Sequence, residues 1–212
     1  MDNDFTLAAV IIVIVIGLIV LFVWMKSQGR RRVVKAISEA QESLKLTVFV
    51  GTHPQLDAAW IAVRGQVSGL TIKIFGGRSR RGRNLGGSIA TPIDKAFVLV
   101  VVTLPSVIPF RFTIQRRTAL STPRFGTSYA EFDKNVEVIT DNEKKALTLL
   151  NSEQLRDAIV SFIKSASHAF ITTSEVMIKV SSDRQILTVA REALNIATLL
   201  GNQIKKISAD DK

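Results

Sequence analysis

The sequence LAAVIIVIVIGLIVLFVWM at residues 7–25 decides the fold expected of this chain, because it carries no charged side chain. As an α-helix rising 1.5 Å per residue it would be roughly 28 Å long, about the thickness of a bilayer's hydrocarbon core. A helix also pairs its own backbone groups, as a lipid-embedded segment must. The sequence therefore predicts a transmembrane helix over 7–25, after a short extracytoplasmic N-terminus over 1–6.

The flanking charges predict the orientation of this helix. Asp2 and Asp4 precede the apolar segment, whereas Lys26 and three arginines follow it. The positive-inside rule then predicts a single-pass protein of the bacterial inner (cytoplasmic) membrane, with its N-terminus outside and the rest of the chain in the cytoplasm. A cleaved signal sequence is the alternative, but the start is acidic and no small-residue cleavage site follows. The membrane anchor is expected to comprise Leu7, Ile11, Ile14, Gly17, Leu21 and Trp24.

The net charge of +10 is unevenly distributed along the chain. Residues 26–130 hold 17 Lys and Arg against 4 Asp and Glu, whereas residues 131–212 hold 11 against 12. A basic surface beside a membrane attracts anionic lipid, and nucleic acid is the competing partner. The absence of cysteine excludes disulfides and thiolate metal sites. The basic side chains expected to contact lipid or a partner protein are Lys26, Arg30, Arg31, Arg32, Arg78, Arg80, Arg81 and Arg83.

Hydrophobic periodicity after the anchor predicts an α+β protein with a mixed, mainly antiparallel sheet and C-terminal helices. Residues 26–44 read as a basic juxtamembrane segment and stalk helix, and residues 45–212 as the cytoplasmic domain. Residues 27–29 predict a short break after the anchor, with a stalk that continues the anchor helix as the alternative. Strands are expected at 46–50, 60–66, 70–75, 97–104, 110–115, 132–139, 169–173 and 175–181. Helices are expected at 144–150, 155–165 and 184–207, the last with Asp183 as its cap.

Two segments are candidates for contact with a partner. Residues 76–87 form a glycine–arginine loop that lacks the Lys-Ser/Thr ending of a phosphate-binding loop, so a solvated loop, a lipid or protein contact and a nucleic-acid contact remain open. Only Phe75 supplies a stacking ring there, which makes nucleic acid the least favoured partner. The apolar residues 96–110 predict a core strand and a turn, with a docking surface as the alternative. In that segment the contact candidates are Val107, Ile108 and Phe110.

No catalytic or metal-binding pattern emerges from the sequence. His53 and His168 are the only histidines, and neither has a carboxylate or second histidine at ligand spacing. Ser161 and Lys164 match a Ser-x-x-Lys pattern, but its companion motifs are missing and the segment fits an amphipathic helix. The expectation is therefore a protein without cofactor, metal or enzymatic activity. A site assembled from distant residues such as Asp133, Lys134 and His168 is the enzymatic alternative.

Several short segments after residue 60 occur together in this order: Ala62-Val-Arg-Gly with the 70–75 strand, Tyr129-Ala-Glu-Phe-Asp with Val136 and Val138, and the segments 146–150 and 155–162. With these segments the chain resembles a bacterial family of membrane-anchored proteins with an uncharacterised cytoplasmic domain. The resemblance implies an α+β domain and no known activity. No functional residue is transferred by it.

These observations predict a non-enzymatic accessory or scaffolding subunit of a larger membrane protein complex. An energy-transducing complex, respiratory or photosynthetic, is one example of such a complex. Its expected partners are membrane lipid and integral membrane proteins, with no small-molecule substrate. A membrane-tethered nucleic-acid-binding protein and a membrane enzyme are the alternatives.

Overall fold

The computed structural model describes residues 2–54, 56–79, 96–118, 125–165, 168–181 and 185–210. The strands are β1 (Thr47–Val48), β2 (Leu56–Val67), β3 (Leu70–Ser79), β4 (Ala96–Thr103), β5 (Phe112–Arg116), β6 (Val136–Thr140), β7 (His168–Ile171) and β8 (Glu175–Ser181). The helices are α1 (Asp2–Leu44), α2 (Ala130–Asn135), α3 (Glu143–Leu149), α4 (Glu153–Ser165) and α5 (Ile186–Asp210). The strands form one antiparallel sheet in the order β1-β2-β3-β4-β8-β7-β5-β6. This confirms the α+β class with an antiparallel sheet and C-terminal helices.

The hairpin of β2 and β3 is the longest strand pair and follows from its turn. Ser68 and Gly69 both adopt positive φ angles, of 52° and 80°. Two such residues between paired strands match the right-handed twist of a hairpin, and Val67 accordingly pairs with Leu70. The strands predicted at 60–66 and 70–75 are confirmed.

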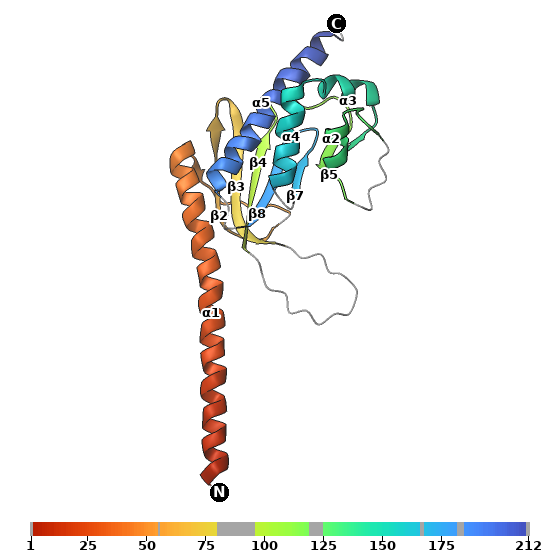
Figure 1. Ribbon diagram of the computed structural model, residues 1–212. Helices are drawn as coiled ribbons and strands as arrows, with labels where there is room; N and C mark the ends of the chain where they lie inside the picture. The colour runs from red at the N-terminus through yellow and green to blue at the C-terminus, as the bar shows by residue number, and fades with distance from the viewer. Residues whose placement is uncertain are drawn as a thin grey trace.

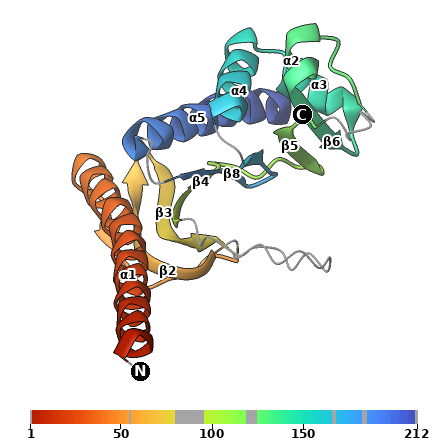
Figure 2. The same cartoon turned by 60° about the horizontal axis from the view of Figure 1, so that its bottom comes forward.

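The central strand β4 is buried on both faces, as its continuous apolar sequence predicts. Val98, Val100 and Val102 enter the main core, on the face that α5 covers. Leu99 and Val101 point to the opposite face and belong to a second, smaller cluster. We call this opposite face, turned away from α4 and α5, the outer face of the sheet (Figures 1 and 2).

Helix α5 covers the inner face of the sheet and follows the apolar stripe predicted for residues 184–207. Its alanines Ala190, Ala193 and Ala197 are fully buried, and small side chains allow a helix to approach its neighbours closely. Figure 2 shows α4 and α5 packed as one layer above the strands. The predicted cap at Asp183 lies outside the described residues.

The C-terminal part of α1 is docked on the same inner face. Val33, Ile37 and Ala40 are fully buried there, one helical face contacting β2, β3 and α5. Gly76 of β3 makes this approach possible, because an added Cβ would lie 2.5 Å from Val33 Cγ1 and 2.6 Å from Ile37 Cδ1. The helix is continuous through residues 27–29, so the predicted break there is wrong, and α1 extends beyond the domain (Figure 1).

The predicted transmembrane helix is corrected by the structure. Over the side chains that the structure describes, no helix has the length and apolar character needed to cross a membrane. A span needs about 20 consecutive apolar residues, a length that no described stretch of α1 supplies. The prediction of a single-pass inner-membrane protein, with its N-terminus outside and its domain in the cytoplasm, is therefore wrong. Leu7, Ile11 and Lys26 lie outside the described side chains.

Two local predictions also differ from the structure. Residues 132–139 were expected as one strand, but α2 occupies the first part and only β6 is extended. Phe132, Val136 and Val138 are nevertheless all buried. The first part of the loop expected at 76–87 belongs instead to β3, which continues to Ser79. Arg80, Arg81 and Arg83 lie outside the described residues.

Candidate functional site

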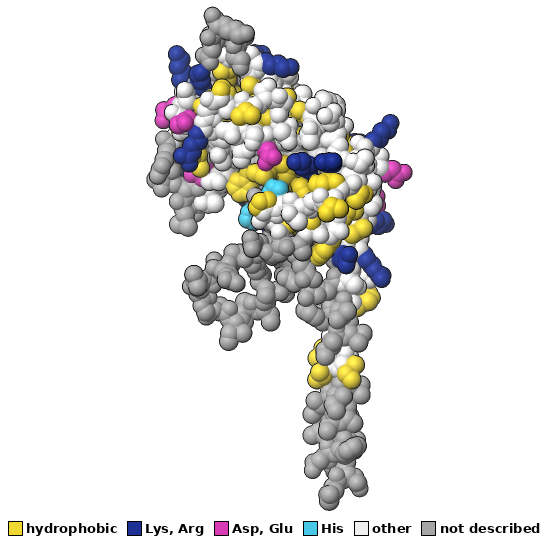
Figure 3. Space-filling view, turned by 180° about the vertical axis from the view of Figure 1, so that it is seen from behind, with side chains coloured by type: hydrophobic (Ala, Val, Ile, Leu, Met, Phe, Trp, Pro, Cys, Tyr) yellow, Lys and Arg dark blue, Asp and Glu magenta, His cyan; other side chains and the backbone are white. Residues whose placement is uncertain are grey.

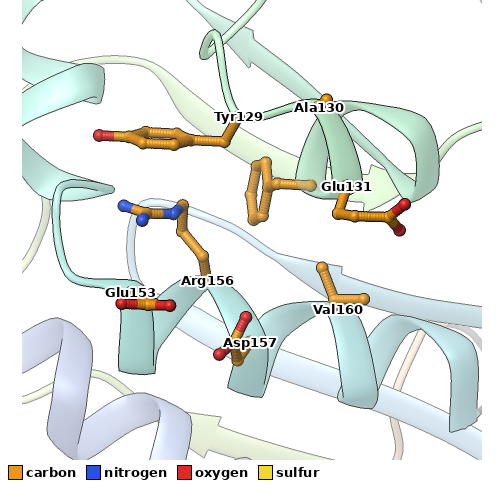
Figure 4. A pocket seen from close by; sticks show the side chains of 8 residues that line it. Tyr129, Ala130, Glu131, Glu153, Arg156, Asp157 and Val160 are labelled. Carbon is orange, nitrogen blue, oxygen red and sulfur yellow. The ribbon is translucent and has the colours of Figure 1, made fainter.

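An open groove of about 280 Å³ lies between α2 and α4. Tyr129 and Phe132 supply aromatic rings, Val160 an aliphatic side chain, and Arg156 a guanidinium group. Figure 4 shows the Tyr129 ring over the Arg156 side chain, with the Glu153 carboxylate below it. The remaining lining residues are Ala130, Glu131 and Asp157.

Arg156 joins three parts of the groove. Its guanidinium carbon lies 3.5 Å from the centroid of the Tyr129 ring, in cation–π geometry. Its Nη1 donates hydrogen bonds of 2.8 Å to the backbone oxygens of Leu150 and Asn151. These carbonyls lie at the C-terminal end of α3, where helix oxygens lack intrahelical donors. Arg156 thus fixes α4 to the end of α3 and to the Tyr129 ring.

Asp133 positions the segment that carries Tyr129. Its carboxylate accepts hydrogen bonds from the Thr127 backbone N–H, at 3.0 Å to each oxygen, and from Thr127 Oγ1 at 2.6 Å. Thr127 is almost fully buried, so these bonds satisfy polar groups that water does not reach. Arg117 Nη1 donates to the Asp133 backbone oxygen at 2.6 Å. Asp133 therefore has a structural role in the wall of the groove.

The residues of the enzymatic alternative are not assembled into a reactive group. Asp133 is engaged with Thr127, Lys134 is exposed on α2, and His168 is exposed at the start of β7. Ser161 and Lys164 are both exposed on α4, whose buried side chains are those of the amphipathic helix predicted there. Within the described ranges, no group of three or more His, Asp or Glu side chains is arranged to hold a metal ion.

The other predicted contact residues are distributed over several elements. Arg30, Arg31 and Arg32 are exposed on α1, and Arg78 lies in β3 with its side chain outside the described set. Val107 is 65% exposed and Ile108 only 2%, so the two neighbours have opposite roles in the turn after β4. Phe110 is half-buried and packs edge-on against Phe112, with ring centroids 5.8 Å apart.

No pattern in the sequence predicted the groove. Tyr129 and Arg156 are far apart in the chain, and neither belongs to a recognisable motif. Their pairing depends on α4 packing against α2, which is a tertiary contact. Asp133 was predicted only as one of the scattered residues of the enzymatic alternative, and in the structure its carboxylate is the hydrogen-bond acceptor for Thr127.

A second polar site lies on the outer face of the sheet, at His53. Its ring centroid is 5.5 Å from that of Phe75, which Phe49 contacts edge-on at 5.7 Å. Burial lowers the pKa of His53 below its ordinary value of 6.5, Glu175 opposes this shift and Lys73 adds to it. The folded chain therefore favours the neutral form of the His53 imidazole over the protonated form.

The lowered pKa of His53 predicts a stability that depends on pH. Below 6.5 the unfolded chain binds a proton that the folded chain binds less readily, so the free energy of unfolding decreases as the pH falls through this window and is fully retained above it. Denaturant unfolding at about pH 7.5 and about pH 5.5 measures this loss. His53→Gln is expected to reduce it, whereas His168→Gln, a matched change at an exposed histidine, is not. Equal pH dependence of the wild type and His53→Gln would contradict the assignment.

Fold and groove together define an α+β domain with a helix-backed antiparallel sheet and a long N-terminal helix. No family model matches the chain, and no curated protein matches it. Among solved structures, it is similar to the crystal structure of the mycobacterial trehalose monomycolate transport factor A, TtfA, with 11% sequence identity and a TM-score of 0.46. The similarity covers 83% of this chain and 93% of that chain. A likeness at this level does not establish a common fold, and the resemblance to a membrane-anchored bacterial family stays a prediction.

Proposed function

We propose that this chain is a non-enzymatic accessory or scaffolding subunit of a larger protein complex. The observation that carries the proposal is the exposed apolar part of α1, which extends beyond the domain (Figure 1). The large hydrophobic side chains that the structure describes there are between 47% and 60% exposed, at Ile14, Val15, Ile16, Leu18, Leu21 and Trp24.

These side chains point in all directions around the helix. Successive residues of an α-helix are about 100° apart, so Ile14, Val15 and Ile16 alone cover three sides. An amphipathic helix lying on a single surface would carry one apolar stripe, whereas a helix that is apolar all round is covered on all sides. Exposed apolar areas of this kind mark interaction sites. The proposal is therefore that partner proteins surround this part of α1 and bury its apolar side chains.

The groove supports the non-enzymatic part of the proposal. Arg156 donates to two backbone carbonyls and stacks on Tyr129, and Asp133 accepts from Thr127. These two side chains therefore stabilise the groove wall. The three acidic side chains at its rim, Glu131, Glu153 and Asp157, suit the binding of a basic group on a partner.

A pull-down tests the proposal with the full-length chain. Tagged protein is recovered from its source cells in mild detergent, and its partners are quantified by mass spectrometry. We expect a stoichiometric protein partner, and roughly tenfold lower recovery for Leu21→Gln/Trp24→Gln, since two central apolar contacts contribute more than 1 kcal/mol together.

The control variant is Leu147→Gln, which makes the same kind of change at an exposed position of α3. It is expected to retain the partner. The proposal fails if the wild-type chain is recovered without a stoichiometric partner, if the double variant retains it fully, or if the purified chain binds protein-free lipid vesicles through the same side chains.

A further inference from the structure

A row of side chains crosses the outer face of the sheet from β2 to β7. Arg64 pairs with Lys73, Lys73 with Val101, Val101 with Met177, and Met177 with Phe170. Their neighbours in sequence, such as Ile72 and Val100, enter the main core, so the row faces away from α4 and α5. Figure 3, viewed from the side opposite to Figure 1, shows hydrophobic side chains gathered here beside basic, acidic and histidine side chains.

The two ends of this row differ in character. Arg64 is exposed and Lys73 half-buried, and the register places these two cations directly opposite each other. Like charges opposite each other in a sheet repel, which a bound anionic group would relieve. At the other end, Met177 and Phe170 are half-buried apolar side chains next to the buried Val101. The row thus changes from cationic to apolar over neighbouring strands.

Two acidic side chains that the structure describes, Glu175 and Glu137, lie on the side of the sheet where the row is apolar. Glu175 lies two residues from Met177 and acts on His53, while Glu137 accepts a hydrogen bond of 2.8 Å from Gln115 beyond Phe170. Glu175 on β8 and Lys73 on β3 both act on His53, with β4 between them, whereas Arg64 on β2 is one strand farther away. A ligand aligned with its negative end over Arg64 and Lys73 would keep its charge away from these carboxylates.

Cations on the aromatic rings discriminate between two kinds of anionic ligand. The Arg64 guanidinium lies 5.3 Å from the centroid of Phe49, and Lys179 Nζ lies 4.4 Å from that of Phe97. Single-stranded nucleic acid binds by stacking its bases on open aromatic faces. Here the rings of Phe49 and Phe97 each already carry a cation, so these two faces are less open to a stacking base. Met177 adds a flexible side chain of the kind found at adaptable binding surfaces.

We propose that this row docks an extended segment of the partner protein with acidic residues at one end and apolar residues at the other. The inference rests on the proposed function and names the chemistry of the partner. With strands about 4.8 Å apart, the row from β2 to β7 is about 19 Å long, which an extended segment of about six residues spans. Acidic side chains contact Arg64 and Lys73, and apolar ones contact Met177 and Phe170.

Fluorescence anisotropy of a labelled peptide tests the inference with the full-length chain. The probe has about eight residues, with glutamates in its first half and leucines and phenylalanines in its second. We expect saturable binding, weakened at least roughly fivefold in Arg64→Glu/Lys73→Glu. Lys205→Glu/Lys206→Glu is the matched control, because it makes a closely similar change in charge at two exposed positions of α5. Arg64→Gln/Lys73→Gln provides a milder variant in case the charge reversal unfolds the chain.

Four results would overturn the inference: no detectable binding of the probe, equal weakening in the control variant, equal affinity for a probe with glutamine in place of glutamate, or tighter binding of a single-stranded oligonucleotide through the same residues. The proposed function is judged separately, because its pull-down depends on Leu21 and Trp24 of α1. If the α1 variant loses its partner but peptide binding does not change when Arg64 and Lys73 are replaced, the inference is rejected and the proposed function is retained.

Discussion

Replacing Ile37 by aspartate is expected to detach α1 from the sheet and to lower the free energy of unfolding by about 3–5 kcal/mol. Ile37 is fully buried, and its Cδ1 packs against the backbone of Gly76. A carboxylate at this position would lose its water and gain no cation or hydrogen-bond donor among the apolar neighbours Val33 and Ile61. The helix would then relieve the buried charge by leaving the sheet.

Urea denaturation and limited proteolysis measure the two parts of this prediction. The variant is expected to unfold at lower urea, and α1 to be cleaved by trypsin within 30–35, where the basic residues lie. Lys35→Asp is the matched control, since it introduces the same carboxylate on the exposed side of the same helix. If Ile37→Asp and Lys35→Asp unfold alike, the docking of α1 does not depend on this buried face.

The strands and the long helices were predictable because their signals are local. The alternation of Leu70, Ile72 and Ile74 marks a half-buried strand, and the continuous run of β4 marks one buried on both faces. Asn142 is likewise a local signal, because its side chain accepts a hydrogen bond of 3.0 Å from the Lys145 backbone N–H at the start of α3. Each of these features is decided by residues within a few positions of one another.

The sheet order and the groove were not predictable, because they depend on contacts between distant segments. No local pattern indicates that β8 pairs with β4, which places Met177 opposite Val101. Gly76 looked like the start of a flexible loop, yet it is buried because α1 leaves no room for a Cβ there. For the apolar segment of α1 the local composition was misleading, because it predicted a membrane span that the described side chains do not support.

The short helix α2 was missed because helix and strand patterns agree over its length. Phe132 and Val136 are four residues apart, which places both on one side of a helix as well as on one side of a strand. The carboxylate of Asp133 decides between them, since it folds back to accept hydrogen bonds from Thr127. A strand over this segment would break that arrangement.

Replacing Asp133 by alanine is therefore expected to lower the free energy of unfolding by about 3 kcal/mol, because it leaves the buried N–H and hydroxyl of Thr127 without their acceptor. Asp133→Asn retains one carbonyl acceptor and is expected to lose about half as much. Thermal or urea unfolding of the three proteins gives this order directly. Glu131→Ala is the control, since it removes an exposed carboxylate from the same helix and should change stability little.

The same substitution separates a structural role for Asp133 from a catalytic one. The Thr127 segment leads into Tyr129, whose ring stacks on Arg156, so loss of the carboxylate should also loosen the groove. Tyrosine is present once in the chain, and exchange broadening or a shift of its ring signals in NMR spectra would report that loosening. An Asp133→Ala protein that keeps wild-type stability and an unchanged tyrosine spectrum would show that the carboxylate does not hold this wall, and would return Asp133 to the group of candidate reactive residues.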